Sequence, residues 1–153
     1  LQEVFELMEP LAEPKALQLK LELEATDWQC QTDEGKLRQV FINPLGNAVK
    51  FTPKDGVVRV RASCEEGWVT VAVEDNGPGI DKQQLEHIFE VFEQAASHSS
   101  TSGTGLGLAI AREIVRGHGG DIRIETKAEG EETGQPSGST FVIKLPLSGI
   151  AAE

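Results

Sequence analysis

Two asparagines and a lysine recur at helical spacing on one side of a predicted helix from Leu37 to Phe51. Asn43, Asn47 and Lys50 stand at positions i, i+4 and i+7, opposite a broad apolar side. A solvated surface gives the same pattern, but asparagine is an indifferent helix former, which weakens that interpretation. A carboxamide oxygen can bind Mg²⁺, and a nearby lysine can bind phosphate.

A second group of residues follows a predicted strand that ends at Val73. The stretch from Glu74 to Ile80 reads EDNGPGI and places Asp75 beside Gly77 and Gly79. Such a stretch can be a simple turn. It is also suited to bind a purine, because the glycines let a ligand approach the backbone and an ionised carboxylate can only accept hydrogen bonds. It would therefore select the exocyclic amine of adenine over the carbonyl oxygen of guanine.

The third group is GTGLGLAI, from Gly103 to Ile110, at the start of a predicted helix. Its G-x-G-x-G spacing matches neither the dinucleotide-binding fingerprint nor the P-loop, so those two folds are disfavoured. Glycines that open a helix expose N–H groups at its positive end, which can bind phosphate without a basic side chain. As an isolated signal this pattern is weak.

The hydrophobic pattern predicts the elements that must position these groups. Alternating apolar residues predict strands near 17–23, 58–62, 69–73, 122–124 and 141–145. Helical spacing of Leu1, Val4, Phe5, Met8 and Leu11 predicts a first helix, which Pro10 and Pro14 are expected to end. Asp33 and Asp81 are expected to cap two further helices, and a last helix runs from about 105 to 116. The order predicts an α/β sandwich, with a mixed, mostly antiparallel sheet of about five strands and helices on one face.

Composition limits the partners. The chain has 153 residues, 39% hydrophobic and 25% charged, as expected for one globular domain. Its formal net charge of -11 argues against nucleic acid and against direct contact with an anionic membrane, since both need a basic surface. No apolar run approaches the ~20 residues of a membrane span, so we expect a soluble chain. Because it begins at Leu1 rather than methionine, we expect a piece of a longer polypeptide.

Together, the motifs resemble those of a known family. NPLGNAVKFTPKDG, VEDNGPGI, IFEVFEQ and GTGLGLAIAREIV are similar, in this order, to the N, G1, F and G2 boxes of the catalytic, ATP-binding domain of sensor histidine kinases. That domain has the Bergerat fold, which gyrase and Hsp90 share. The resemblance covers almost the whole chain, down to HGGDI and GSTFVIKLP. It implies a single catalytic domain over residues 1–153, with 1–14 as a helical link from an upstream domain and 95–103 as the ATP lid.

The resemblance also implies which residues bind Mg²⁺ and ATP. Asn43, Asn47 and Lys50 resemble catalytic residues on the phosphate side, and Asn47 also resembles the metal ligand. Asp75 resembles the residue that reads adenine. The other residues implied to contact the nucleotide are Phe51, Gly77, Gly79, Ile80, Phe92, Gly103, Thr104, Gly105, Leu106, Gly107, Leu108 and Thr140. The phenylalanines of the F box, Phe89 and Phe92, are at least as well explained as packing residues.

The resemblance implies that the domain presents the γ-phosphate of Mg·ATP to a histidine on a separate dimerisation domain. None of the three histidines, His87, His98 and His118, begins a helical His-Glu pattern, so the acceptor is expected upstream of Leu1. The implied partners are that phosphotransfer domain, within a homodimer, and a response regulator. The implied location is the cytoplasm, including the cytoplasmic part of a membrane sensor.

Three features bear on the activity. Asn43 favours transfer over hydrolysis, because relatives that hydrolyse ATP carry Glu there and an amide is not a base. No Lys or Arg occurs from Gln83 to Ala111, although family lids usually hold one near the γ-phosphate. Pro44, with Gly46, is expected to kink or loosen the predicted helix at a cost of about 3 kcal/mol. A nucleotide-binding module without transfer, and an ATPase of the same superfamily, therefore remain as alternatives.

Overall fold

The structure, a computed structural model, describes residues 1–24, 32–89, 107–127 and 137–147. In chain order the elements are α1 (Gln2–Ala12), the 3₁₀ turn η1 (Glu13–Lys15), β1 (Gln18–Leu23), α2 (Glu34–Phe51), β2 (Val57–Glu65), β3 (Trp68–Asp75), α3 (Lys82–Leu85), α4 (Gly107–Gly117), β4 (Asp121–Lys127) and β5 (Gly138–Pro146). Apart from the added turn η1, this is the predicted order of helices and strands.

The strands form one mixed sheet in the order β1-β2-β3-β5-β4. Strands β1 and β2 pair in parallel, and the other three neighbouring pairs are antiparallel. The β2–β3 hairpin turns at Glu66 and Gly67, whose φ angles of 52° and 80° suit a two-residue turn that follows the twist of the strands. The predicted α/β sandwich with a mostly antiparallel five-stranded sheet is confirmed.

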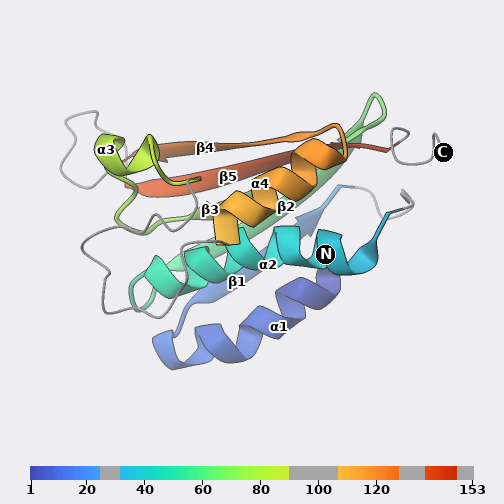
Figure 1. Ribbon diagram of the computed structural model, residues 1–153. Coiled ribbons are helices and arrows are strands. Elements are labelled where there is room, and N and C mark those ends of the chain that lie inside the picture. The colour runs from blue at the N-terminus through green and yellow to red at the C-terminus, as the bar shows by residue number, and fades with distance from the viewer. Residues whose placement is uncertain (25–31, 90–106, 128–136, 148–153) are drawn as a thin grey trace.

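Helices α1, α2 and α4 lie side by side on one face of the sheet, with α2 in the middle (Figure 1). Alternate strand residues form the core beneath them. The largest fully buried side chains are Leu45, Ile143, Val40, Val58, Val60, Val71, Val73, Val115, Thr52 and Pro44. Strand β1 turns its polar residues to the opposite face, away from α1, α2 and α4. Within the described ranges, none of the helices has the length and apolarity needed to cross a membrane.

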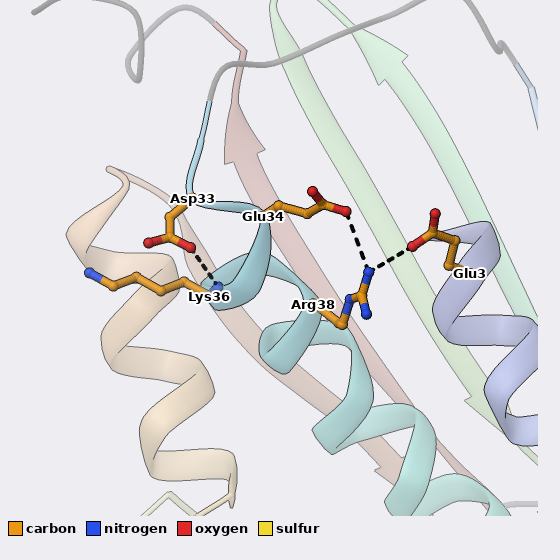
Figure 2. A network of polar contacts seen from close by, with 5 residues as sticks. All are labelled: Glu3, Asp33, Glu34, Lys36 and Arg38. Atoms are coloured by element: carbon orange, nitrogen blue, oxygen red, sulfur yellow. Dashed lines mark hydrogen bonds and ion pairs between the residues drawn. The ribbon is translucent and has the colours of Figure 1, made fainter.

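The first turn of α2 is held by polar contacts. Asp33 is its N-cap, as predicted, and its Oδ1 accepts a hydrogen bond from the backbone N–H of Lys36 at 3.1 Å. Arg38 forms ion pairs with Glu34, at 3.4 Å, and with Glu3 of α1, at 2.7 Å (Figure 2). The N-terminal half of α2 is therefore tied to α1 at the surface.

Pro44 lies inside α2 and is fully buried. Because proline has no N–H, the carbonyl of Val40 lacks its usual intrahelical donor. The helix nevertheless runs without interruption from Glu34 to Phe51. Leu45 and Ala48 beside it are buried in the core, so packing compensates for the missing hydrogen bond. The helix that carries the two asparagines is intact.

The end of α1 differs from the sequence prediction. The helix continues through Pro10 to Ala12, and only then does η1, which contains Pro14, begin. Leu11, expected on the core side, is 59% exposed, whereas Ala12 is buried. Counted from Met8, the core side falls at i+4 rather than i+3, which the sequence spacing did not resolve. The role of residues 1–14 as a link to an upstream domain stays a prediction.

Replacing Asp33 by alanine should lower the free energy of unfolding by about 1 kcal/mol, because the Lys36 amide then loses its acceptor. Urea unfolding of the chain measures this loss. Asp81 is the matched control: it caps the four-residue α3 through a 2.8 Å bond from the Gln83 amide. A loss for Asp81→Ala as large as that for Asp33→Ala would contradict the central place of α2 in the fold.

Candidate functional site

The polar side of α2 meets the start of α4. Asn43 and Asn47 are half-buried, and Lys50 is exposed. The side-chain amide of Asn43 donates through Nδ2 to the backbone carbonyl of Gly107 at 2.7 Å. A Cβ at position 107 would lie 3.1 Å from Asn43 Oδ1, so glycine permits this close approach. The structure thus joins the asparagine and glycine motifs across 64 residues of sequence.

Only part of the glycine motif can be located. Gly107 is the first residue of α4, and Leu108, the second, is buried in the hydrophobic core. Phe92, His98, Gly103, Thr104, Gly105, Leu106 and the expected lid at 95–103 lie outside the described residues. Their contacts with ATP, and any contact of Leu108 with it, stay predictions.

The C-terminal end of α2 lies against the turn that follows β3. Lys50 Nζ lies 5.4 Å from the centroid of the Phe51 ring, a cation–π contact. A Cβ on Gly77 would lie 3.4 Å from the carbonyl oxygen of Phe51 and 3.0 Å from Asp75 Oδ1. Gly77 therefore allows the end of α2 and the Asp75 carboxylate to come together at one place.

Asp75 ends β3 on the face that the helices cover. It pairs with Ser139 of β5, and its Oδ1 accepts a hydrogen bond from the Gly77 amide at 2.9 Å. Burial raises the pKa of the Asp75 carboxyl, and hydrogen bonds from the backbone N–H groups of Gly77 and Ser139 oppose that shift. A carboxyl group with a raised pKa at the meeting point of several elements is a candidate functional group.

A pair of hydroxyl groups supports the turn after Asp75. Thr126 Oγ1, on β4, accepts a hydrogen bond from the Ile80 amide at 2.8 Å. The same oxygen lies 3.0 Å from Ser139 Oγ and 3.2 Å from the carbonyl oxygen of Gly138, to which it can donate. Ile80, and the turn that ends at it, are therefore held by the last two strands.

Thr140, which the resemblance places near adenine, lies on the other face of the sheet. It pairs with Glu74 and Glu125, and successive side chains of a strand point to opposite faces. It lines a depression of about 560 Å³, to which Lys20, Val57, Arg59, Glu74 and Glu125 also contribute from that face. Its contact with adenine stays a prediction.

Sequence reasoning missed Ser139 and Thr126, although one signal for Ser139 was available. Phe141 reads as a core residue of the last strand, so strand alternation puts Ser139 on the same face and Thr140 on the opposite one. No local pattern distinguishes Thr126, because its contacts come from a strand pairing and from a turn distant in sequence.

Phe89, the F box phenylalanine within the described part of the chain, packs against the core. Asp81 caps α3 as predicted, and Phe89 follows that helix. Phe89 is half-buried against the core, and the guanidinium carbon of Arg112 lies 4.7 Å from its ring centroid. These contacts support the packing role that the sequence left open for Phe89.

The oxygens near the asparagine side of α2 suit one kind of metal site. Among the described residues, no group of three or more His, Cys, Asp or Glu gathers to hold an ion. Asn43 and Asn47 instead offer carboxamide oxygens. Mg²⁺ commonly takes one or two protein oxygens and completes its shell with water and substrate phosphates. This donor set therefore fits an ion that arrives with a nucleotide.

Comparison with known proteins gives a consistent result. A family model described as "Histidine kinase-, DNA gyrase B-, and HSP90-like ATPase" matches residues 32–149. The signal transduction histidine-protein kinase/phosphatase MprB of Mycolicibacterium paratuberculosis is 36% identical over 129 residues, which is 84% of this chain and 24% of that protein. The chain thus spans about a quarter of the length of this curated relative.

Solved structures are similar as well. Full-length ShkA, in complex with AMPPNP, is 34% identical, with a TM-score of 0.78 over 95% of this chain and 28% of that chain. The histidine kinase ThkA, in complex with the response regulator protein TrrA, is 27% identical, with a TM-score of 0.75 over 97% of this chain and 39% of that chain.

The matched residues, 32–149, contain every element from α2 to β5, and so the contacts of Asn43, Asp75 and Thr126 described above. The family indicated by the order of the motifs is confirmed. The chain belongs to the histidine kinase-, DNA gyrase B- and HSP90-like ATPases.

Proposed function

We propose that this chain is the ATP-binding catalytic domain of a sensor histidine kinase, whose intact form transfers the γ-phosphate of Mg·ATP to a histidine on a separate domain. One observation carries the proposal: Asn43 contacts Gly107, while the end of the same helix lies against the Asp75 turn. The similarity to the histidine kinases MprB and ThkA supports a kinase. The ShkA complex supports ATP as ligand, because AMPPNP is an ATP analogue.

Asp75 reads the base in this proposal. Its ionised carboxylate accepts a hydrogen bond from the exocyclic amine of adenine, whereas guanine would present a second acceptor. The Gly77 amide holds Oδ1 in place at 2.9 Å. Withdrawal from water strengthens a hydrogen bond to this group, because the local dielectric constant is lower than that of water.

The phosphates lie toward Lys50 and the start of α4. The first N–H groups of α4 and the Lys50 ammonium would face the negative charge. Asn47 would hold Mg²⁺ through its carboxamide oxygen, and the bound ion would neutralise charge on the phosphate oxygens. Local neutralisation matters here, because a net charge of -11 repels a polyanionic ligand at long range.

Transfer, rather than hydrolysis, follows from the residue at position 43. An amide cannot take a proton from water, and the Asn43 amide is already bound to Gly107. His118 does not suit the acceptor role either, because both of its ring nitrogens are engaged. His118 donates from Nδ1 to the Ile114 carbonyl and binds Thr32 Oγ1 through Nε2, both at 2.7 Å. In this proposal the acceptor is a histidine of another domain.

The partners of the intact protein belong to the same proposal. An upstream domain supplies dimerisation and the acceptor histidine, and a response regulator receives the phosphate. The complex of ThkA with TrrA supports the second partner. We also propose a cytoplasmic location, as part of a sensor kinase.

A nucleotide-binding module without transfer is the second candidate. It is favoured by the absence of Lys and Arg from Gln83 to Ala111, the range that contains the expected lid. The intact protein decides between the two. With γ-labelled ATP and Mg²⁺, a histidine of the upstream domain should become labelled, and Asn47→Ala should reduce the label strongly. Binding of ATP without any label would support the module instead.

Mg·ATP should raise the melting temperature of this chain, because a ligand that binds only the native state stabilises it. Asp75→Asn should abolish most of the rise in melting temperature. The introduced asparagine would present an N–H group to the exocyclic amine of adenine, which needs an acceptor. Asp81→Asn is the matched control and should respond as the unchanged chain does. No rise at millimolar ATP would contradict an ATP site, and equal responses of the two variants would make Asp75 only a turn residue.

The stability of the ligand-free chain should depend on pH through Asp75. Burial raises the pKa of this carboxyl in the folded state, so the native chain binds its proton more tightly than the unfolded chain does. The stabilising contribution of that proton is lost as the pH rises through the folded pKa. Asp75→Asn removes the effect, so the stability of this variant relative to the unchanged chain should rise as the pH is raised above about 4, the ordinary pKa of an aspartic acid. Denaturant unfolding from about pH 4 upward measures the free energy of unfolding of both chains. A difference between them that shrinks as the pH rises would contradict a raised pKa for Asp75.

A further inference from the structure

Lys15, in η1, binds the end of α2 from outside the candidate site. Its ammonium Nζ donates to the backbone carbonyls of Val49, at 2.9 Å, and Lys50, at 2.8 Å. Its own carbonyl accepts a hydrogen bond from the Asp55 amide at 2.9 Å. One residue therefore holds both the last turn of α2 and the turn that follows it.

These contacts meet a general need of helix ends. The last four carbonyls of an α-helix have no intrahelical donor, and they form the negative end of the helix dipole. In α2 the Thr52 amide donates a hydrogen bond to the carbonyl of Ala48. The next two carbonyls, of Val49 and Lys50, accept hydrogen bonds from the positively charged Lys15 ammonium. Burial lowers the pKa of the Lys15 ammonium, which is consistent with its withdrawal from water.

The segment that Lys15 holds is the one that approaches the Asp75 turn. Lys50 and Phe51 leave α2 from its last turn, and the Phe51 carbonyl lies next to Gly77. Thr52 is completely buried, and a Cβ on Gly56 would overlap its Cγ2. The last turn of α2 is thus enclosed between Lys15 on one side and the Asp75 turn on the other.

We propose that Lys15 is a positioning residue of the nucleotide site. By holding the carbonyls of Val49 and Lys50, it fixes the direction in which the Lys50 and Phe51 side chains leave α2. Because η1 follows α1 directly, the same contacts connect α1 to the phosphate side of the site. The identity of the ligand rests on the proposed function, whereas the contacts of Lys15 do not.

Arg38 provides a matched control. Like Lys15, it is a cation that connects the α1 side of the fold to α2, here through its ion pair with Glu3, while its second ion pair, with Glu34, lies within α2 (Figure 2). It lies near the opposite end of α2, and its side chain is 42% exposed. Arg38→Met therefore removes a comparable tie without touching the last turn of the helix.

Titrations of the chain with Mg·ATP and with adenosine test the proposal. Lys15→Met should weaken Mg·ATP binding about tenfold, the effect expected when a charged hydrogen-bond donor is lost. The affinity for adenosine should fall much less, because Asp75, the proposed adenine-binding residue, is held by Gly77 and Ser139 rather than by Lys15. Lys15→Arg keeps the positive charge and can still donate to both carbonyls, so it should restore most of the affinity for Mg·ATP. Arg38→Met should leave the affinities for Mg·ATP and for adenosine unchanged. Equal losses for Mg·ATP and adenosine would indicate general destabilisation and overturn the positioning role.

Hydrogen exchange of the Thr52 amide gives a readout without ligand. It should be faster in Lys15→Met and unchanged in Arg38→Met, because only the first frees the end of α2. If Lys15→Met does not fold, Lys15→Gln is measured in the same way. Unchanged exchange together with unchanged Mg·ATP affinity would overturn the proposal. Failure of the unchanged chain to bind Mg·ATP would instead overturn the proposed function, and the exchange rates would still decide whether Lys15 holds the helix.

Discussion

The packing of α2 against the sheet is the interaction on which the rest of the structure depends. Val40, Leu45 and Val49 are buried on its inner side. Each large aliphatic side chain that leaves water stabilises the fold by about 1.5–3 kcal/mol. Together they outweigh the cost of about 3 kcal/mol for a proline inside a helix, so α2 stays whole through Pro44. Because the inner side is anchored, the other side presents Asn43 and Asn47 at a fixed orientation.

Charge imposes the second constraint. The chain is strongly acidic, yet its proposed ligand is a polyanion, so attraction has to be local. The start of α4 and Lys50 can provide it, since helix N–H groups and an ammonium act at short range. Asp75 adds a cost of its own, because burial disfavours its ionised form. In the proposed function, recognition of the base accounts for a carboxyl group at this position, where its ionised form does not favour folding.

Much of the fold follows from local patterns in the sequence. Strand alternation, the two aspartate caps and the Glu66–Gly67 turn each depend on residues close together in the chain, so they could be predicted. The end of α1 was predicted wrongly for a related reason. A proline lowers the local preference for helix, but the buried Ala12 lets the helix continue past Pro10. Packing decided that boundary.

The sequence by itself determined the family, the order of the elements and the residue types of the site, because motifs and periodicity are local properties. The tertiary structure alone decided which of those residues meet. It brings Asn43 to Gly107, puts Ser139 rather than Thr140 on the face of Asp75, and joins Lys15 to the end of α2. Such contacts join residues far apart in the chain. They arise from how helices and strands pack to bury apolar surface, which no short pattern of residues specifies.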